Sequence, residues 1–232
     1  MKTIFITGIN RGLGKALFQL FITRGYHVYG LLRNAAAAEE LKKAMPSNGN
    51  IILADIGHDA SIASIKEAVG ETTVHLLINN AGIAGESFLL SDTAPDEVLD
   101  LFNIHCLGVL RVVKALQANL SKAEDPVVVN INSRFGSITR QSLGVYSDLD
   151  VSYSYRIAKA AQNMLTNCMK AEMGQEVTFV SLHPGRMKTD IAQTDADLDP
   201  QEVAASILQS YEKGLFEDEN GIVELNKGVI EW

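Results

Sequence analysis

The stretch that decides the fold is Thr7–Gly14, TGINRGLG, which follows the short apolar run Thr3–Thr7 and leads directly into the amphipathic segment Leu13–Arg24. Glycines at such a junction permit a tight turn and a close approach of the backbone to a ligand. A pyrophosphate can then sit on the exposed N–H groups of a helix N-terminus. Because the spacing is G-x-x-x-G-x-G rather than the general G-x-G-x-x-G fingerprint, the loop indicates a dinucleotide site but also fits a turn without a ligand.

Outward from this loop, short β-rich runs alternate with amphipathic stretches along the whole chain. Runs rich in Ile, Val or Leu predict strands at Thr3–Thr7, His27–Leu32, Asn50–Ala54, Leu76–Asn79, Val127–Ile131 and Val177–Leu182, with Ile222–Leu225 as a seventh. Helices are predicted at Leu13–Arg24, Glu39–Met45, Ser61–Val69, Pro95–Leu120, Tyr155–Met173 and Pro200–Lys213. This alternation predicts an α/β fold with a doubly wound, Rossmann-like parallel sheet of about seven strands, in a single domain over residues 1–232.

The amino-acid composition indicates which kinds of partner and which cellular compartment the protein is expected to have. The 232 residues, 47% hydrophobic and 21% charged, can bury a large core. A formal net charge of −8 would repel a phosphate backbone, so we expect no nucleic-acid partner. The cysteines Cys106 and Cys168 are too few for a disulfide framework, which favours a cytoplasmic location. Met1–Gly8 lacks the apolar length of a signal peptide or membrane span, so we expect no membrane association.

The residue at the end of the second predicted strand bears on the choice of dinucleotide. An NAD site commonly places an acid there, about 20 residues beyond the glycine loop, to bind ribose hydroxyls. This chain has Arg33 instead. A guanidinium cannot accept such a hydrogen bond but can bind a 2′-phosphate, and Arg11 lies in the loop nearby. The two arginines favour NADP(H), unless both are solvated surface charges.

Five motifs follow one another in a characteristic order along the predicted sheet. They are Thr7–Gly14, Asn79-Asn80-Ala81-Gly82, Ser133, Tyr155-x-x-x-Lys159, and Pro184-Gly185 with Thr189. Together they resemble the short-chain dehydrogenase/reductase superfamily over nearly the whole chain. The wide interval from Ser133 to Tyr155, the segment Ser181–Gly185 and the ending at Trp232 are similar to C-factor-like proteins and Sniffer-type carbonyl reductases.

We expect NADP(H) to contact residues from four of these motifs, as the resemblance implies, and residues at the ends of the second and third predicted strands. They are Gly8, Asn10, Arg11, Gly12, Leu13, Gly14, Arg33, Asp55, Ile56, Asn80, Ala81, Gly82, Tyr155, Lys159, Pro184, Gly185, Met187 and Thr189. Asp55 matches a family acid near the adenine, although a turn entering a helix explains it almost as well. Asn80–Gly82 would stabilise the sheet and pass close to the cofactor, and a plain turn at a strand end is the alternative.

The pair Tyr155 and Lys159 carries the predicted chemistry. Four residues apart on a helix, the two side chains share a face, and an ammonium beside a phenol favours the phenolate. Tyr155 would then act as general acid or base, while Tyr153 lacks such a partner because Ile157 follows it. The resemblance implies that Ser133 holds the substrate oxygen and that Lys159 also contacts the nicotinamide ribose. Individually, these residues also fit an ordinary helix boundary and a loop cap.

His105 departs from the family pattern, which has an active-site asparagine three residues before a glycine, here Gly108. Asn103 lies two positions earlier and points elsewhere on a helix. His105 would preserve the relay water of the family or exchange protons itself near pH 6.5, and the alternative is a satisfied helix residue. With Cys106 it lacks the spacing of further metal ligands, so we assign no metal.

The substrate predicted from this pattern is a small carbonyl or alcohol compound. Apolar lining is expected from Phe135, Leu143, Val145, Tyr146, Met187 and Ile191. Nearby cations that would admit an acidic group, unless surface solvation explains them, are Arg134, Arg140, Arg186 and Lys188. The resulting function is an NADPH-dependent carbonyl reductase-like enzyme with a homodimer as one possible state. A non-catalytic NADP(H)-binding regulator of the same fold is the alternative, and a methyltransferase would have no use for the Tyr155 and Lys159 pair.

Overall fold

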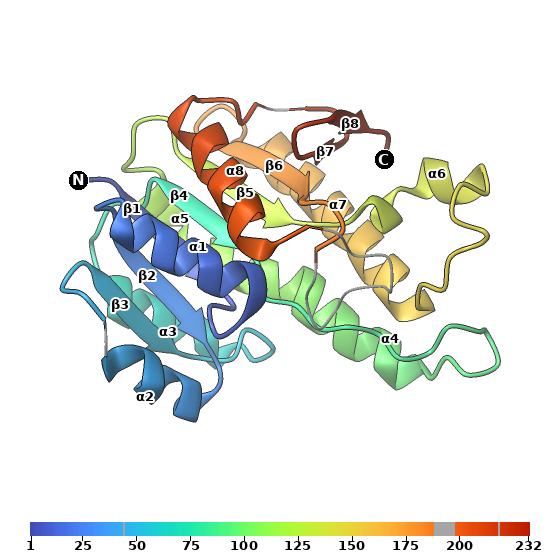
Figure 1. Ribbon diagram of the computed structural model, residues 1–232, viewed down its shortest axis with the longest axis horizontal. Coiled ribbons are helices and arrows are strands. Elements are labelled where there is room, and N and C mark those ends of the chain that lie inside the picture. The colour runs from blue at the N-terminus through green and yellow to red at the C-terminus, as the bar shows by residue number, and fades with distance from the viewer. Residues whose placement is uncertain (44, 188–197, 218) are drawn as a thin grey trace.

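Eight strands form one sheet at the centre of the computed structural model (Figure 1). The structure describes residues 1–43, 45–187, 198–217 and 219–232. Among these residues the strand order is β3-β2-β1-β4-β5-β6-β7-β8, with parallel pairs throughout except for the antiparallel pair of β7 and β8. Their bounds are Thr3–Thr7, His27–Leu32, Gly49–Leu53, Leu76–Asn79, Val127–Ile131, Thr178–His183, Ile222–Glu224 and Gly228–Ile230 for β1 to β8. The order reverses between β1 and β4, where open parallel sheets place a ligand crevice.

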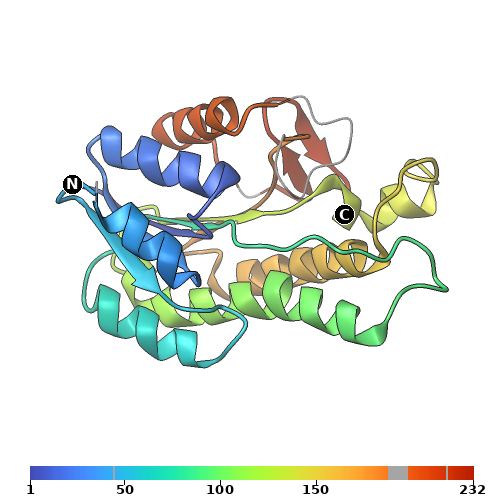
Figure 2. The same ribbon diagram turned by 60° about the horizontal axis from the view of Figure 1, so that its bottom comes forward.

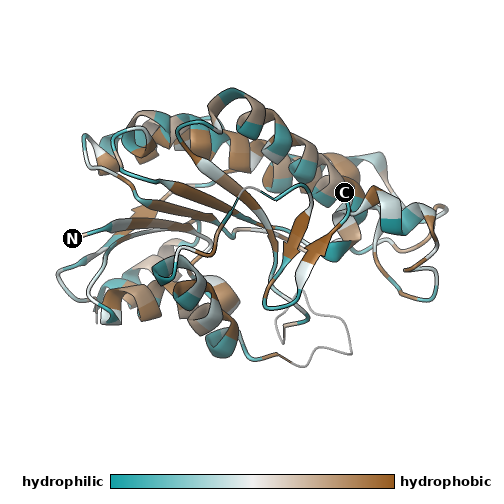
Figure 3. Ribbon diagram, turned by 90° about the horizontal axis from the view of Figure 1, so that it is seen from above, coloured by the Kyte–Doolittle hydropathy of each residue, from teal (hydrophilic) through white to brown (hydrophobic). Residues whose placement is uncertain are grey.

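Helices cover both faces of the sheet (Figure 2). One face carries α1 (Gly12–Thr23), α2 (Ala35–Lys43) and α8 (Pro200–Glu212). The other carries α3 (Ala60–Val69), α5 (Gly108–Leu120), which continues α4 (Pro95–Phe102), and α7 (Tyr153–Met173). The alternation of side chains along β1 explains the two cores, because Ile4 and Ile6 enter the first and Phe5 the second. The mainly hydrophobic strands lie between these layers (Figure 3).

The doubly wound α/β sheet is confirmed, and four strands have the predicted bounds. The third and sixth strands are shifted by one residue, and the seventh is present as β7. The structure adds β8, whose three residues are too few to carry a periodic pattern. A turn in which Asn226 adopts a φ of 63° joins β8 to β7.

The predicted helix Pro95–Leu120 is confirmed as one uninterrupted helical run, but it contains a π-helical turn that the sequence pattern does not predict. The π-helical turn Asn103–Leu107 separates α4 from α5, and the Gly108 N–H donates to the Asn103 carbonyl. The structure also adds the short α6, Ile138–Ser142, and a 3₁₀ turn at Arg134–Gly136.

Capping side chains explain where α2 and α7 begin. Asn34 accepts a hydrogen bond from the Ala37 N–H at 2.9 Å, so α2 begins at Ala35, the first residue of the alanine run Ala35–Ala38, and includes Glu39 within its length. Ser152 caps α7 by accepting from the Tyr155 N–H at 3.2 Å, so α7 begins at Tyr153. In the described part of the chain, every helix is too short or too polar to cross a bilayer.

Candidate active site

A cavity of about 1100 Å³ opens at the carboxyl ends of the parallel strands. Its lining brings together almost all the residues predicted to contact the cofactor: Gly8, Asn10, Arg11, Gly12, Leu13, Arg33, Asp55, Ile56, Asn80, Ala81, Gly82, Tyr155, Lys159, Pro184, Gly185 and Met187. Ser133 and His105 line the same cavity. Gly14 is not in the lining, and Thr189 falls outside the described residues.

The loop between β1 and α1 is shaped by two glycines. Gly8 has a φ of 75°, and a Cβ there would lie 2.8 Å from the Ala81 Cα. A Cβ on Gly14 would lie 2.1 Å from the Gly8 carbonyl oxygen, so Gly14 serves the packing of α1 against the loop. The side chain of Arg11, the residue before α1, makes no capping hydrogen bond. The first N–H groups of α1 are therefore not capped by this residue and suit an anion.

The Asn80 and Ala81 segment ties the end of β4 to the end of β1. The Thr7 hydroxyl accepts from the backbone N–H groups of both residues at 3.0 Å. The Asn80 amide donates to the Thr7 carbonyl at 3.0 Å and to the Gly8 carbonyl at 3.2 Å. One strand further, Asn79 donates to the Asn130 side chain at 2.8 Å. These bonds stabilise the strand ends that form the floor of the cavity.

Arg33 and Asp55 lie together at one end of the cavity. Their side chains form an ion pair at 4.0 Å, and the Arg33 side chain is 62% exposed. Asp55 also accepts a hydrogen bond from the Gly57 N–H at 2.9 Å, which closes a turn after β3. Both expectations for Asp55 are therefore compatible with its position, since it lines the cavity and organises a turn.

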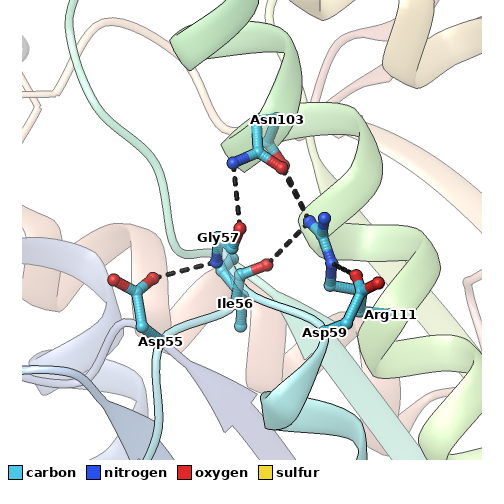
Figure 4. Close-up of polar contacts among 6 residues, drawn as sticks. All are labelled: Asp55, Ile56, Gly57, Asp59, Asn103 and Arg111. Atoms are coloured by element: carbon cyan, nitrogen blue, oxygen red, sulfur yellow. Dashed lines mark hydrogen bonds and ion pairs between the residues drawn. The ribbon is translucent and has the colours of Figure 1, made fainter.

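A polar network that the sequence analysis missed holds this turn against the π-helical segment (Figure 4). Arg111 on α5 donates to Asp59 at 2.6 Å, to the Ile56 carbonyl at 3.0 Å and to the Asn103 side-chain oxygen at 2.8 Å. The Asn103 amide in turn donates to the Gly57 carbonyl at 2.9 Å. Two of these partners are backbone carbonyls, which no side-chain motif reveals. The only available signal is a single arginine on a largely buried helix.

Tyr155 and Lys159 meet Ser133 on the opposite side of the cavity. The Lys159 ammonium lies 5.7 Å from the centre of the Tyr155 ring. It donates to the Ile131 carbonyl at 2.8 Å and to the Gln162 side chain at 3.0 Å. Ser133 accepts from the Phe135 N–H at 3.3 Å, so its hydroxyl also caps the 3₁₀ turn as the alternative interpretation supposed. Tyr153, in contrast, is 40% exposed and lies outside the cavity lining.

The expected lowering of the Tyr155 pKa is not what the structure indicates. Burial raises the pKa of Tyr155 to about 12, and a hydrogen bond from Ser133 only partly opposes this. Burial also lowers the pKa of Lys159 to about 7, so the ammonium that would stabilise a phenolate is itself partly lost near neutral pH. The phenol is therefore protonated at neutral pH and suited to donate a proton.

His105 lies in the π-helical turn beside Tyr155, with the two ring centres 5.5 Å apart and nearly perpendicular. Its Nε2 is 2.8 Å from the Ile83 carbonyl oxygen, which favours the tautomer with the proton on Nε2. Burial, helped by the charge of Lys159, lowers the pKa of His105 to about 3, which corrects the expectation of titration near 6.5. A Cβ on Gly82 would lie 2.6 Å from the imidazole. His105 is thus a neutral ring fixed against the backbone.

The substrate end of the cavity differs in part from the predicted lining. Phe135 and Met187 line it, while Tyr146 is buried behind Phe135, with ring centres 5.0 Å apart. Leu143 and Val145 are exposed and do not line it, because they follow α6 onto the surface. Additional apolar lining that was not predicted comes from Ile83, Ala84, Phe88, Leu149 and Val151.

Two of the four cations expected near this end line the cavity. Arg134 and Arg186 line the cavity, whereas Arg140 lies outside its lining. Lys188 and Ile191 fall outside the described residues. Across the described ranges, His, Cys, Asp and Glu side chains form no group that would hold a metal ion.

Comparisons with known sequences give a consistent result. A sequence model of the short chain dehydrogenase family matches residues 2–199. The short chain dehydrogenase tazN of Aspergillus terreus is 30% identical over 200 residues, which cover 82% of this chain but only 42% of tazN. C-signal of Myxococcus xanthus is 34% identical over 137 residues, which cover 59% of this chain and 79% of C-signal.

Two solved structures resemble this chain over its whole length. Carbonyl reductase Sniffer of D. melanogaster has a TM-score of 0.86 and 29% identity, with all of both chains covered. The NADPH-bound carbonyl reductase from chicken fatty liver has a TM-score of 0.86 and 27% identity, covering 100% of this chain and 99% of that one. The likeness to C-factor and Sniffer proteins expected from the motifs is therefore confirmed.

Proposed function

The chain belongs to the short-chain dehydrogenase family, and we propose that it is an oxidoreductase that transfers a hydride between NADP(H) and a carbonyl or alcohol substrate. The observation that carries this proposal is that Ser133, Tyr155 and Lys159 line one cavity with the glycine loop. The likeness to a carbonyl reductase with bound NADPH supports both the cofactor and the reaction. When bound, the nicotinamide supplies or accepts the hydride.

The described residues fit a phosphorylated dinucleotide. The N–H groups at the start of α1 would hold the pyrophosphate, and Gly8 leaves the backbone free to approach it. Arg33 would bind the 2′-phosphate, and Arg11 also lines the cavity. Lys159 would contact the nicotinamide ribose at the other end. These positions support NADP(H) rather than NAD(H).

Tyr155 is the residue that we propose moves the proton. With a pKa of about 12 its phenol is protonated, so in the direction of reduction its O–H gives the proton to the carbonyl oxygen as the hydride adds to the carbonyl carbon. The product is an alcohol, and solvent returns the proton to Tyr155. Ser133 would donate a hydrogen bond to the same oxygen, and Lys159 in its ammonium form would stabilise the phenolate that remains.

The experiment that tests the proposal is a panel of carbonyl substrates followed by NADPH absorbance. Tyr155→Phe should abolish reduction while NADPH binding stays nearly intact, because the ring remains and only the hydroxyl group that donates the proton is lost. Lys159→Ala should lower both the rate of carbonyl reduction and the affinity for NADPH. Tyr153→Phe is the matched control, since this phenol is exposed and outside the cavity. Retention of most activity in Tyr155→Phe would refute the assigned role.

A second candidate function is an NADP(H)-binding regulator without catalysis. Two observations favour it: His105 replaces the usual family asparagine, and C-signal is among the relatives. The same panel separates the two functions. Tight NADPH binding with no turnover of any carbonyl compound would support the regulator, while turnover that depends on Tyr155 would support the enzyme.

A further inference from the structure

Arg134 occupies a distinctive place in the cavity wall. It directly follows Ser133, begins the 3₁₀ turn after β5, and belongs to the cavity lining. Its guanidinium carbon lies 4.9 Å from the centre of the Phe135 ring and 5.8 Å from that of Tyr146. These two rings pack edge to face, so they form a firm support that limits the freedom of the guanidinium.

The guanidinium of Arg134 lacks an anion within the described ranges. Its Nε is buried and has no hydrogen-bond partner there, and no carboxylate forms an ion pair with it. Four other arginines, Arg24, Arg33, Arg111 and Arg140, pair with Glu212, Asp55, Asp59 and Glu231. Arg156 forms no ion pair with a described residue either, but its guanidinium donates to the Gln141 side chain and to the Leu149 carbonyl. A partly buried cation without a counter-charge is unfavourable unless a ligand supplies one.

The surroundings of Arg134 do not neutralise it. His183, which also lines the cavity, is held neutral by burial and by the nearby positive charges, so its pKa falls to about 4. Glu224, the acid facing His183, is already paired with Lys227 at 2.8 Å. Asp148 lines the cavity but is exposed and makes no ion pair with Arg134 in the described structure. Asp150 also lines the cavity and is exposed, and no ion pair joins it to Arg134. Within the described residues the guanidinium beside the proposed carbonyl site therefore has no ion-pair partner.

We propose that Arg134 binds a carboxylate of the substrate, so that the preferred substrates are short oxo acids rather than neutral ketones. The inference rests on the proposed function, since Ser133 and Tyr155 would hold the reacting carbonyl. A planar guanidinium matches a carboxylate through two parallel hydrogen bonds. Ser133 and Arg134 are neighbours in the chain and both line the cavity, so one small molecule can present its carbonyl to Ser133 and its carboxylate to Arg134. Phe135 and Val151 would contact the carbon chain between them.

The test compares acids with their neutral esters. NADPH oxidation is measured with 2-oxobutanoate, 3-oxobutanoate and 4-oxopentanoate and with the methyl ester of each. The parent protein should reduce at least one acid with a higher kcat/KM than its ester. Arg134→Gln should lower kcat/KM for that acid roughly ten- to hundredfold, as expected for loss of a charge-assisted bond, and change the ester less than about threefold. Arg134→Lys should have a kcat/KM for that acid between those of the parent and of Arg134→Gln, because lysine restores the positive charge but not the planar guanidinium that binds both carboxylate oxygens.

Arg140→Gln is the matched control, because it removes the same charge from α6, six residues further along the chain and outside the cavity lining. It should leave kcat/KM unchanged for both the acids and the esters. Equal losses for acid and ester in Arg134→Gln, or a parent that prefers every ester, would overturn the proposal. If none of the six compounds is reduced, the broader carbonyl panel decides the proposed function separately, and butanoate binding to the protein loaded with NADP⁺, measured by calorimetry, decides the subsite. Binding that is lost in Arg134→Gln and kept in Arg140→Gln would support it, and no binding to the parent would overturn it.

Discussion

At the scale of single residues, burial dominates the proton chemistry of the cavity. His105, Tyr155 and Lys159 all have pKa values displaced toward their neutral forms, to about 3, 12 and 7. Desolvation is the largest cause in each case, whereas the spacing of Tyr155 and Lys159 in the sequence indicates only the effect of the neighbouring charge. A sequence motif indicates which side chains lie close together, but how deeply they are buried depends on the packing of the folded chain.

His105 should therefore not titrate in the working range of the enzyme. We expect His105→Asn to keep activity within about threefold and to leave the acidic limb of the kcat profile unchanged, because an imidazole with a pKa of about 3 is neutral above pH 5. His105→Leu should lose roughly tenfold or more, since the Ile83 carbonyl would lose its buried donor. A kcat series from pH 5 to 9, with NADPH binding as a check on folding, decides this. A shifted acidic limb in His105→Asn would contradict the neutral ring.

Arg33 should govern the choice between cofactors. NADPH is expected to bind at least roughly tenfold more tightly than NADH, because a guanidinium gains a charge-assisted bond from the 2′-phosphate. Arg33→Asp should reduce the ratio of the two affinities, because the variant should bind NADPH more weakly and NADH more tightly. Arg24→Asp is the control, since Arg24 is similarly exposed but pairs with Glu212 outside the cavity lining. Equal affinities for the two cofactors in the parent, by competition titration, would remove the basis for an NADP(H) assignment.

At the scale of elements, the strands were easier to predict than the π-helical turn. Buried runs such as Leu76–Asn79 carry their own signal, because both faces are apolar. The turn Asn103–Leu107 has no such pattern, and its cause is tertiary: Asn103 and Arg111 are held by the carbonyls of the loop after β3. The turn places His105 against Ile83 while Asn103 faces the loop, so Asn103 does not take the place of the missing asparagine.

Arg111 should act as a positioning residue for the end of the cavity that carries Arg33 and Asp55. Arg111→Met keeps the aliphatic stem but removes the bonds to Asp59, the Ile56 carbonyl and Asn103. We expect the KM for NADPH to rise several-fold with kcat little changed, and the free energy of unfolding to fall by about 1–3 kcal/mol. Lys114→Met, an exposed change on the same helix, should alter neither. An unchanged KM in Arg111→Met would show that the loop holds its position without the network.

At the scale of the whole molecule, the sequence motifs identify residues on both sides of the cavity, but they do not identify every residue that lines it or holds its loops in place. The glycine loop, Ser133, Tyr155 and Lys159 were found because they share an order along the chain and all end at one sheet edge. Phe88 and Arg111 are not identified by these motifs, because their places depend on how loops fold over that edge.

The homodimer stays a prediction. The exposed Ile157 and Met164 mark one side of α7 where a second copy could pack, and light scattering of the purified protein decides it.

Lys159 also links the site to the stability of the entire fold. Burial lowers its pKa from 10.5 to about 7, so between these pH values the unfolded chain binds a proton that the folded chain does not. Stability must then rise with pH in this window, by roughly 1.4 kcal/mol per pH unit from this group, and level off outside it. Lys159→Met removes the contribution, so the parent should gain about 2 kcal/mol more than the variant between pH 7.5 and 9 in urea unfolding. Lys66→Met, at an exposed position on α3, should behave like the parent. The same pH dependence in the parent and in Lys159→Met would mean that Lys159 keeps its charge in the folded protein, and that its bonds to Ile131 and Gln162 offset the burial.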